Sequence, residues 1–83
     1  MIDRKMIKDV IVKSLELHQN TEENITENSR IQTDLGIDSL DSVEVEIEVQ
    51  NGLDFEFDCE TNEMFFELML SDCTVRELID YLN

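Results

Sequence analysis

Residues 43–59 read Val-Glu-Val-Glu-Ile-Glu-Val-Gln-Asn-Gly-Leu-Asp-Phe-Glu-Phe-Asp-Cys, and the fold class depends on how this stretch folds. Apolar and acidic residues alternate on both sides of Asn51-Gly52. Alternation is typical of a β-strand with one buried face, and two such runs joined by Asn-Gly are a strong signal for a β-hairpin. Taken from the residues alone, the periodicity favours the hairpin.

The same stretch also permits an α-helix. Val45, Val49 and Leu53 recur at four-residue steps, which places them on one side of a helix. Val43 and Ile47 would fall on a neighbouring side of that helix. Both interpretations therefore stay open until residues outside this stretch are considered.

The two ends of the chain predict helices. From about Asp3 to His18, apolar residues recur at three- and four-residue steps and form one stripe, and a long polar loop is expected from Gln19 onward. Thr74 and Glu77 have the spacing of a capping box, in which each side chain binds the backbone N–H of the other residue. A short terminal helix is expected to follow.

The composition limits the class of protein. Eighty-three residues make at most one domain, so we expect residues 1–83 to form a single domain. Six Lys and Arg against 21 Asp and Glu give a net charge of −15, which repels nucleic acid and opposes self-association. No apolar run is long enough to be a signal peptide or a membrane span. We therefore expect a cytoplasmic monomer that binds no nucleic acid.

Catalytic and metal-binding patterns are missing from the sequence. His18, the only histidine, is interpreted as a surface residue rather than a base, and no serine lies in a Gly-x-Ser-x-Gly motif. Cys59 and Cys73 are interpreted as reduced structural thiols, and with His18 they are too few and too scattered for zinc. The calcium-loop spacing from Asp54 lacks the turn glycine and the final glutamate. We predict a protein that is not an enzyme and has no metal site.

Residues 34–44, Asp-Leu-Gly-Ile-Asp-Ser-Leu-Asp-Ser-Val-Glu, contain the strongest candidate site. A loop that contains Gly36 leads to Asp38, which can cap the free backbone amides of a helix. Ser39 then lies exposed in the first turn, where the helix dipole favours an anion such as a phosphate. By composition alone, Ser39 is an ordinary helix-start residue.

This motif resembles the phosphopantetheine-attachment motif of acyl carrier proteins, whose serine lies in an Asp-Ser-Leu triplet after Asp-Leu-Gly. The resemblance is specific over residues 34–44 and extends more weakly over the chain, including Thr-Val-x-x-Leu-Ile-Asp-Tyr-Leu at residues 74–82. It implies that Ser39 carries a covalent 4′-phosphopantetheine arm, whose thiol holds an acyl group as a thioester. It also implies that Asp38 and Leu40 belong to the cofactor-binding site.

The resemblance further implies partners. A phosphopantetheinyl transferase would load the arm, and acyl-loading and acyl-transfer enzymes of lipid or secondary-metabolite biosynthesis would bind through basic docking patches. The residues implied for docking are Asp41, Glu44, Ile47 and Glu48. Between Ile31 and Val75 the chain has no Lys or Arg, which agrees with such a docking face. The alternative function is an acidic interaction or regulatory module without a prosthetic group.

The resemblance also implies an all-α fold, a small four-helix bundle of acyl-carrier type. Three helices are the main ones, and the third helix in the chain would be atypically long and apolar. Residues 43–59 would then contain the end of a helix from Ser39 to about Gln50, with Gly52 in a left-handed conformation after it.

Two features depart from the usual acyl-carrier pattern. Glu46 lies on the apolar side of the expected helix, where a carboxylate could shorten or divert an acyl pocket. The segment Met64–Leu70 is apolar almost all round, more than one small core can bury. We interpret Phe65, Phe66 and Met69 as contacts for a partner or cargo, and core packing is the alternative.

Overall fold

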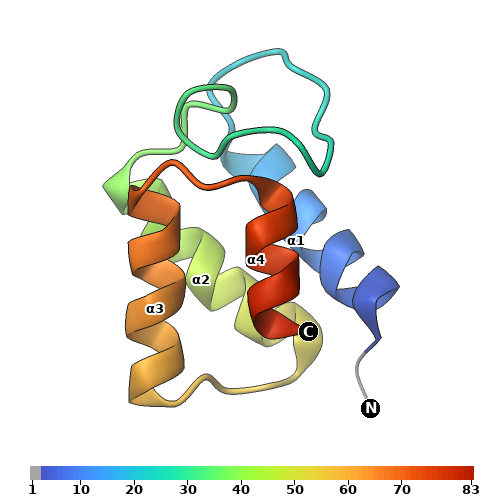
Figure 1. Ribbon diagram of the computed structural model, residues 1–83, viewed down its shortest axis with the longest axis vertical. Coiled ribbons are helices and arrows are strands. Elements are labelled where there is room, and N and C mark those ends of the chain that lie inside the picture. Colours follow the sequence, from blue (N-terminus) through green and yellow to red (C-terminus); the bar gives the residue numbers. More distant parts are fainter. Residues whose placement is uncertain (1–2) are drawn as a thin grey trace.

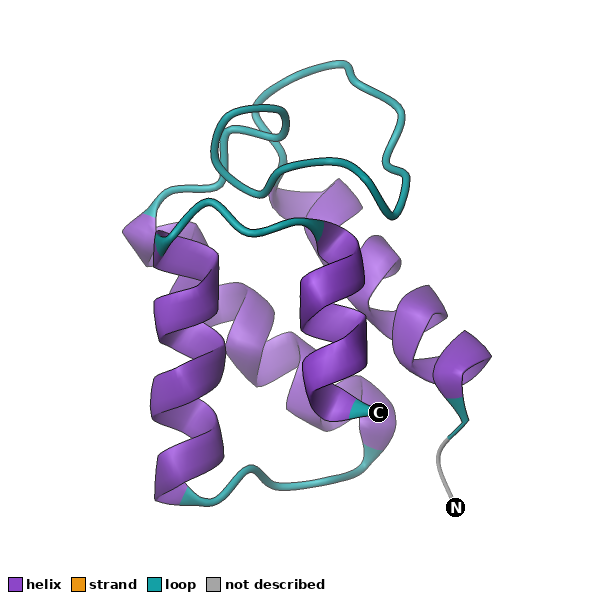
Figure 2. Ribbon diagram, in the orientation of Figure 1, coloured by secondary structure: helices purple, strands orange, loops and turns teal. Residues whose placement is uncertain are grey.

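The computed structural model describes residues 3–83, which form four α-helices arranged around one hydrophobic core (Figure 1). The helices are α1 (Arg4–His18), α2 (Ser39–Leu53), α3 (Cys59–Leu70) and α4 (Val75–Leu82). In residues 3–83 the only β-type pairing is an isolated bridge between Arg30 and Thr74 (Figure 2). The all-helical prediction is confirmed, and the hairpin that local periodicity favoured does not form.

Helix α2 forms because the alternating stretch also contains a helical stripe. Val45, Val49 and Leu53 are buried in the core. Val43 and Ile47, the other apolar residues of the alternating run, are 44% and 53% exposed. Burial of one apolar set against the other helices therefore outweighs the local preference for strands, because an isolated hairpin has little core of its own to bury.

The C-terminal end of α2 differs from the prediction. Gly52 is helical, and the helix continues to Leu53. The left-handed residue is instead Asp54, with φ 53°, which is the C-cap. Gly52 is needed for close packing, because a Cβ at this position would lie 2.6 Å from Val10 Cγ1 of α1. The glycine thus permits the approach of two helices rather than a turn.

Helix α3 places two side chains, Phe65 and Met69, in the core. It has 12 residues, fewer than the 15 of α1 and of α2 and more than the 8 of α4. Phe65 and Met69 are fully buried, and the Phe65 ring packs 5.4 Å from that of Phe57, centroid to centroid. Our interpretation of Phe65 and Met69 as partner or cargo contacts is therefore wrong. Phe66 is only partly buried, and Met64 is exposed.

The loop between α1 and α2 covers one end of the bundle (Figure 1). Ile31, Leu35 and Ile37 bury their side chains in the core. The Ile31 N–H donates to the Cys73 carbonyl at 2.9 Å, which ties the loop to the turn before α4. The predicted capping box of Thr74 and Glu77 is present at the start of that helix. The loop is therefore held at its centre as well as at its ends.

One acidic residue of this loop forms ion pairs with three cations. Glu27 lies 2.6 Å from Arg4, 3.4 Å from Lys8 and 3.4 Å from Arg76, measured between side-chain nitrogen and oxygen atoms. We call these four residues the Glu27 cluster. The hydrogen bond from Arg4 is the main reason why the pKa of Glu27 falls to about 2. The cluster joins the loop to both terminal helices.

The two cysteines lie in different environments. Cys59 is exposed, Cys73 is buried, and both are free thiols. Burial raises the pKa of Cys73 to about 12, so this thiol stays protonated. Within residues 3–83, each helix is too short or too polar to cross a membrane.

Candidate functional site

Ser39 is the first residue of α2, and Asp38 caps the helix as predicted. The Asp38 carboxylate accepts a hydrogen bond from the Asp41 N–H at 2.8 Å. The Asp41 carboxylate reaches back to the Asp38 N–H at 3.4 Å, which completes a capping box. The aspartate pair fixes where the helix begins, and so it fixes the orientation of Ser39.

The turn before Asp38 is fixed by Gly36 and Asn20. Gly36 has a φ of +68°, a conformation that glycine adopts without strain. The Asn20 side chain donates to the Gly36 carbonyl at 2.7 Å, and the Asn20 N–H donates to the Leu35 carbonyl at 2.9 Å. The start of the long loop, just after α1, therefore holds the segment that leads to Ser39. The sequence motif contained Gly36 but gave no sign of Asn20, because the two are separated by most of the loop.

Ser39 and Ser42 have opposite environments although they lie on the same helix. Ser42 is fully buried, and its hydroxyl donates to the Asp38 carbonyl at 2.9 Å. Ser39 is exposed, and among residues 3–83 no hydrogen bond involves its hydroxyl. Of these two serines, only Ser39 is therefore open to an incoming reagent.

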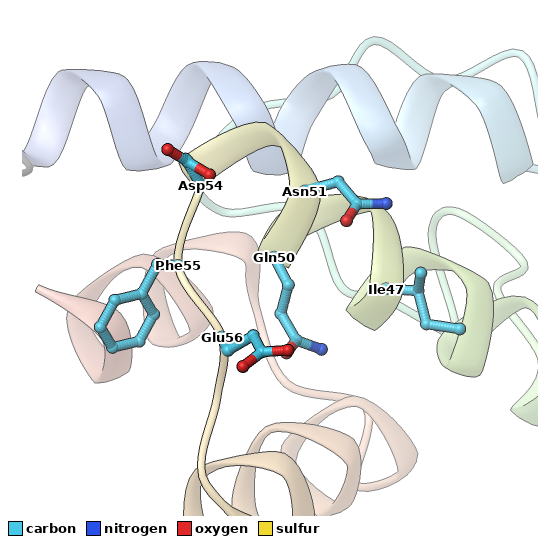
Figure 3. A pocket seen from close by; sticks show the side chains of 6 residues that line it. All are labelled: Ile47, Gln50, Asn51, Asp54, Phe55 and Glu56. Carbon is cyan, nitrogen blue, oxygen red and sulfur yellow. The ribbon is translucent and has the colours of Figure 1, made fainter.

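The exposed surface beside Ser39 combines apolar and acidic side chains. Leu40 is 78% exposed, and Ile47 lies two turns further along the same helix. At the end of α2 an open hollow of about 390 Å³ adjoins Ile47 (Figure 3). The hollow is lined by Ile47, Gln50, Asn51, Asp54, Phe55 and Glu56. A surface of this kind, with apolar groups among carboxylates, is suited to a partner that offers both basic and apolar groups.

The three acids implied for docking meet around His18, at the end of α1. His18 Nε2 lies 2.8 Å from Glu48 Oε2, while His18 Nδ1 lies 3.3 Å from Glu44 Oε2 and 3.9 Å from Asp41 Oδ1. We call His18, Asp41, Glu44 and Glu48 the His18 cluster. The His18 side chain is 15% exposed, so it lies at the surface but is largely covered by its partners.

Electrostatics within the His18 cluster favour the charged form of each partner. The hydrogen bond with Glu48 raises the pKa of His18, and the nearby carboxylates of Glu44 and Asp41 add to this effect. The same bond, with one from the Ser14 hydroxyl at 2.7 Å, lowers the pKa of Glu48. Glu48 is therefore partly used in joining α1 to α2, whereas Glu44, with 63% of its side chain exposed, is freer to meet a partner.

Sequence reasoning missed Ser14, although a signal for it exists. Ile7, Ile11 and Ser14 fall on the buried stripe of α1, and His18 follows at the next four-residue step. A serine on an apolar stripe needs a hydrogen-bond partner, because a buried hydroxyl without one is costly. That position predicts a polar partner on a neighbouring helix, which is Glu48.

Glu46 lies partly buried on α2, as its place on the apolar side suggested. Burial raises the pKa of its carboxyl group.

No family model matches the chain.

Proposed function

We propose that this chain is an acyl carrier protein. Its Ser39 would hold a 4′-phosphopantetheine arm, and the protein would present the attached acyl groups to enzymes of lipid or secondary-metabolite biosynthesis. The observation that carries the proposal is the contrast between the exposed, unbonded hydroxyl of Ser39 and the buried, bonded hydroxyl of Ser42. The fold proposed with it is a four-helix bundle of acyl-carrier type.

The start of α2 fits a phosphate-linked group. The first N–H groups of a helix have no partners within the helix, and the aligned peptide dipoles favour an anion there. Within the described residues 3–83, Asp38 caps only the Asp41 N–H with its side chain. An attached phosphate would therefore lie near backbone donors, and Ser39, being exposed, leaves room for it.

Attachment requires a transferase and coenzyme A. The Ser39 oxygen would displace adenosine bisphosphate at the pyrophosphate of coenzyme A: an O–P bond forms, the pyrophosphate P–O bond breaks, and the hydroxyl proton passes to a base of the transferase. Asp38 would help the transferase to position its metal ion and coenzyme A. When bound, the arm supplies the thiol that carries the acyl group, and the protein supplies recognition. The chain itself catalyses no step in this scheme.

Intact mass tests the attachment site. After co-expression with a phosphopantetheinyl transferase, the chain should gain the mass of one phosphopantetheine group. Ser39→Ala should abolish this gain, whereas Ser42→Ala should keep it, with circular dichroism confirming that both variants are helical. A gain that survives in Ser39→Ala would overturn the assignment. A chain that never gains the group would instead support the alternative, an acidic interaction module.

Loading kinetics test the docking role of α2. Glu44→Lys should slow loading at low salt, because attraction between exposed charges speeds association. The difference from wild type should shrink at higher salt, since the screening length is about 8 Å at physiological ionic strength. Glu63→Lys, a change at an exposed acid of α3, is the matched control. Equal rates for both variants would mean that the acids of α2 serve solubility only.

A further inference from the structure

Three side chains of the His18 cluster point ligand atoms toward one place. These atoms are His18 Nδ1, Asp41 Oδ1 and Glu44 Oε2, and all lie within 4.8 Å of one another. Nδ1 is 3.3 Å from the Glu44 oxygen and 3.9 Å from the Asp41 oxygen. Ligands in a tetrahedral zinc site, with bonds of about 2.0 to 2.1 Å, lie about 3.3 Å apart. Small side-chain adjustments would therefore bring all three atoms to bonding distance.

The imidazole of His18 is already oriented for such a role. Glu48 Oε2 lies 2.8 Å from Nε2, and the Ser14 hydroxyl holds the other oxygen of Glu48 at 2.7 Å. In the neutral imidazole with its proton on Nε2, donated to Glu48, the lone pair of Nδ1 faces Asp41 and Glu44, so a bound metal ion would take the place of the second proton. Histidines that bind metals commonly donate their second ring N–H to a carboxylate in this way. Glu48 and Ser14 thus act as positioning residues.

The negative charge of the three carboxylates around His18 exceeds what one proton on the imidazole can compensate. A protonated His18 offers one positive charge to the carboxylates of Asp41, Glu44 and Glu48, so the cluster keeps a negative charge. Within residues 3–83 no Lys or Arg forms an ion pair with Asp41, Glu44 or Glu48. A divalent ion bound to the neutral imidazole would compensate these carboxylates better than a proton does.

We propose that His18, Asp41 and Glu44 bind one divalent transition-metal ion, of the class of Zn²⁺ or Co²⁺, between the end of α1 and the start of α2. One imidazole nitrogen with two carboxylates suits these ions, whereas Mg²⁺ and Ca²⁺ prefer oxygen ligands alone. The sequence predicted no metal site, because the ligands come from two helices on either side of the long loop. The proposal does not depend on Ser39 carrying an arm.

Calorimetry with Zn²⁺ and Co²⁺ tests the site, on protein whose intact mass shows no added group. We expect one saturable site, lost in His18→Gln and Glu44→Gln, and weakened about 10- to 100-fold in Glu48→Gln. Glu16→Gln, an exposed acid near His18 in sequence, is the matched charge control and should bind like wild type. Cys59→Ser is tested in parallel, because the exposed thiol of Cys59 also attracts zinc.

Nuclear magnetic resonance gives a second readout, since His18 is the only histidine. Zn²⁺ should shift the ¹⁵N signal of Nδ1 much more than that of Nε2. Zinc binding that persists in His18→Gln, that disappears in Cys59→Ser, or that leaves the ring signals unchanged would overturn the proposal. An absence of saturable binding in the wild type would also overturn it.

Discussion

The two ends of α1 carry charge clusters in which the proportions of acids and cations are reversed. At its start, one acid, Glu27, lies among three cations, Arg4, Lys8 and Arg76. At its end, the imidazole of His18 lies among three acids. The first cluster uses half of the six Lys and Arg in the chain, and the second has none of them. Half of the Lys and Arg side chains therefore hold the long loop in place. They do not neutralise the acids around Ser39.

This difference separates a structural function from a binding function. The Glu27 cluster joins three Lys and Arg side chains to one acid, so it holds the loop without a histidine. The His18 cluster depends on a histidine, whose pKa is raised chiefly by its hydrogen bond with Glu48, and the acids around it exceed it in number. A surplus of negative charge beside a candidate modification site attracts basic partners and cations, whereas the Glu27 cluster, with three cations around one acid, has no such surplus.

The largest effect on stability is expected for Glu27→Gln. The variant leaves Arg4, Lys8 and Arg76 without their shared acid, so the melting temperature at pH 7 should fall clearly. The folded pKa of Glu27, about 2, is below its ordinary value of 4.5. Its stabilisation is therefore complete above pH 4.5 and is lost as the pH falls toward 2. The difference in melting temperature between variant and wild type should close over that range.

Glu22→Gln is the control, because Glu22 is exposed in the same loop. It removes an equal charge and should change the melting temperature little. Equal effects of the two variants would mean that the Glu27 cluster does not hold the loop.

A smaller effect, with the opposite dependence on pH, is expected for His18→Gln in buffer that contains a chelator. The folded pKa of His18 is raised above 6.5, so its ion pairs stabilise the fold fully below pH 6.5. This stabilisation, about 1 kcal/mol for a partly screened pair, is lost as the pH rises through the folded pKa. Urea unfolding of wild type and variant at several pH values measures it. A gap that widens toward alkaline pH would contradict the raised pKa.

The smallest effect is expected for Glu44→Gln under the same chelating conditions. Glu44 attracts His18 but also repels the nearby Asp41 and Glu48, so these contributions offset one another. The free energy of unfolding should stay within about 0.5 kcal/mol of wild type. A loss as large as that of Glu27→Gln would show that the two clusters are equally structural.

Local sequence pattern predicted the termini of the fold better than its middle. The stripe of α1 and the Thr74 capping box are local features, and both are confirmed. The alternating stretch was ambiguous because Val43 and Ile47 complete a strand-like pattern while staying exposed on a helix. The resemblance, not the periodicity, pointed to the helix, and packing of Val45 and Val49 explains why the helix forms.

The candidate site could be predicted only where its residues are neighbours in sequence. Asp38 and Ser39 were identified as cap and exposed serine because helix-start chemistry is local. His18 and Asn20 reach the start of α2 from across the loop, and no pattern in one sequence reports such a contact. The burial of Phe65 likewise depends on how α2, α4 and the segment that contains Phe57 pack against α3. The apolar residues of α3 do not by themselves specify this packing.

The hydrogen bonds of the long loop have a consequence for amide exchange with deuterated water. The N–H groups of Asn20, Ile31 and Ile37 each donate to a backbone carbonyl, although the loop has no regular secondary structure. The Ile31 N–H, bonded to Cys73 beside α4, can exchange only when the loop separates from that turn. Its protection should therefore approach that of the core helices, so that part of a segment without helix or strand opens together with the whole fold.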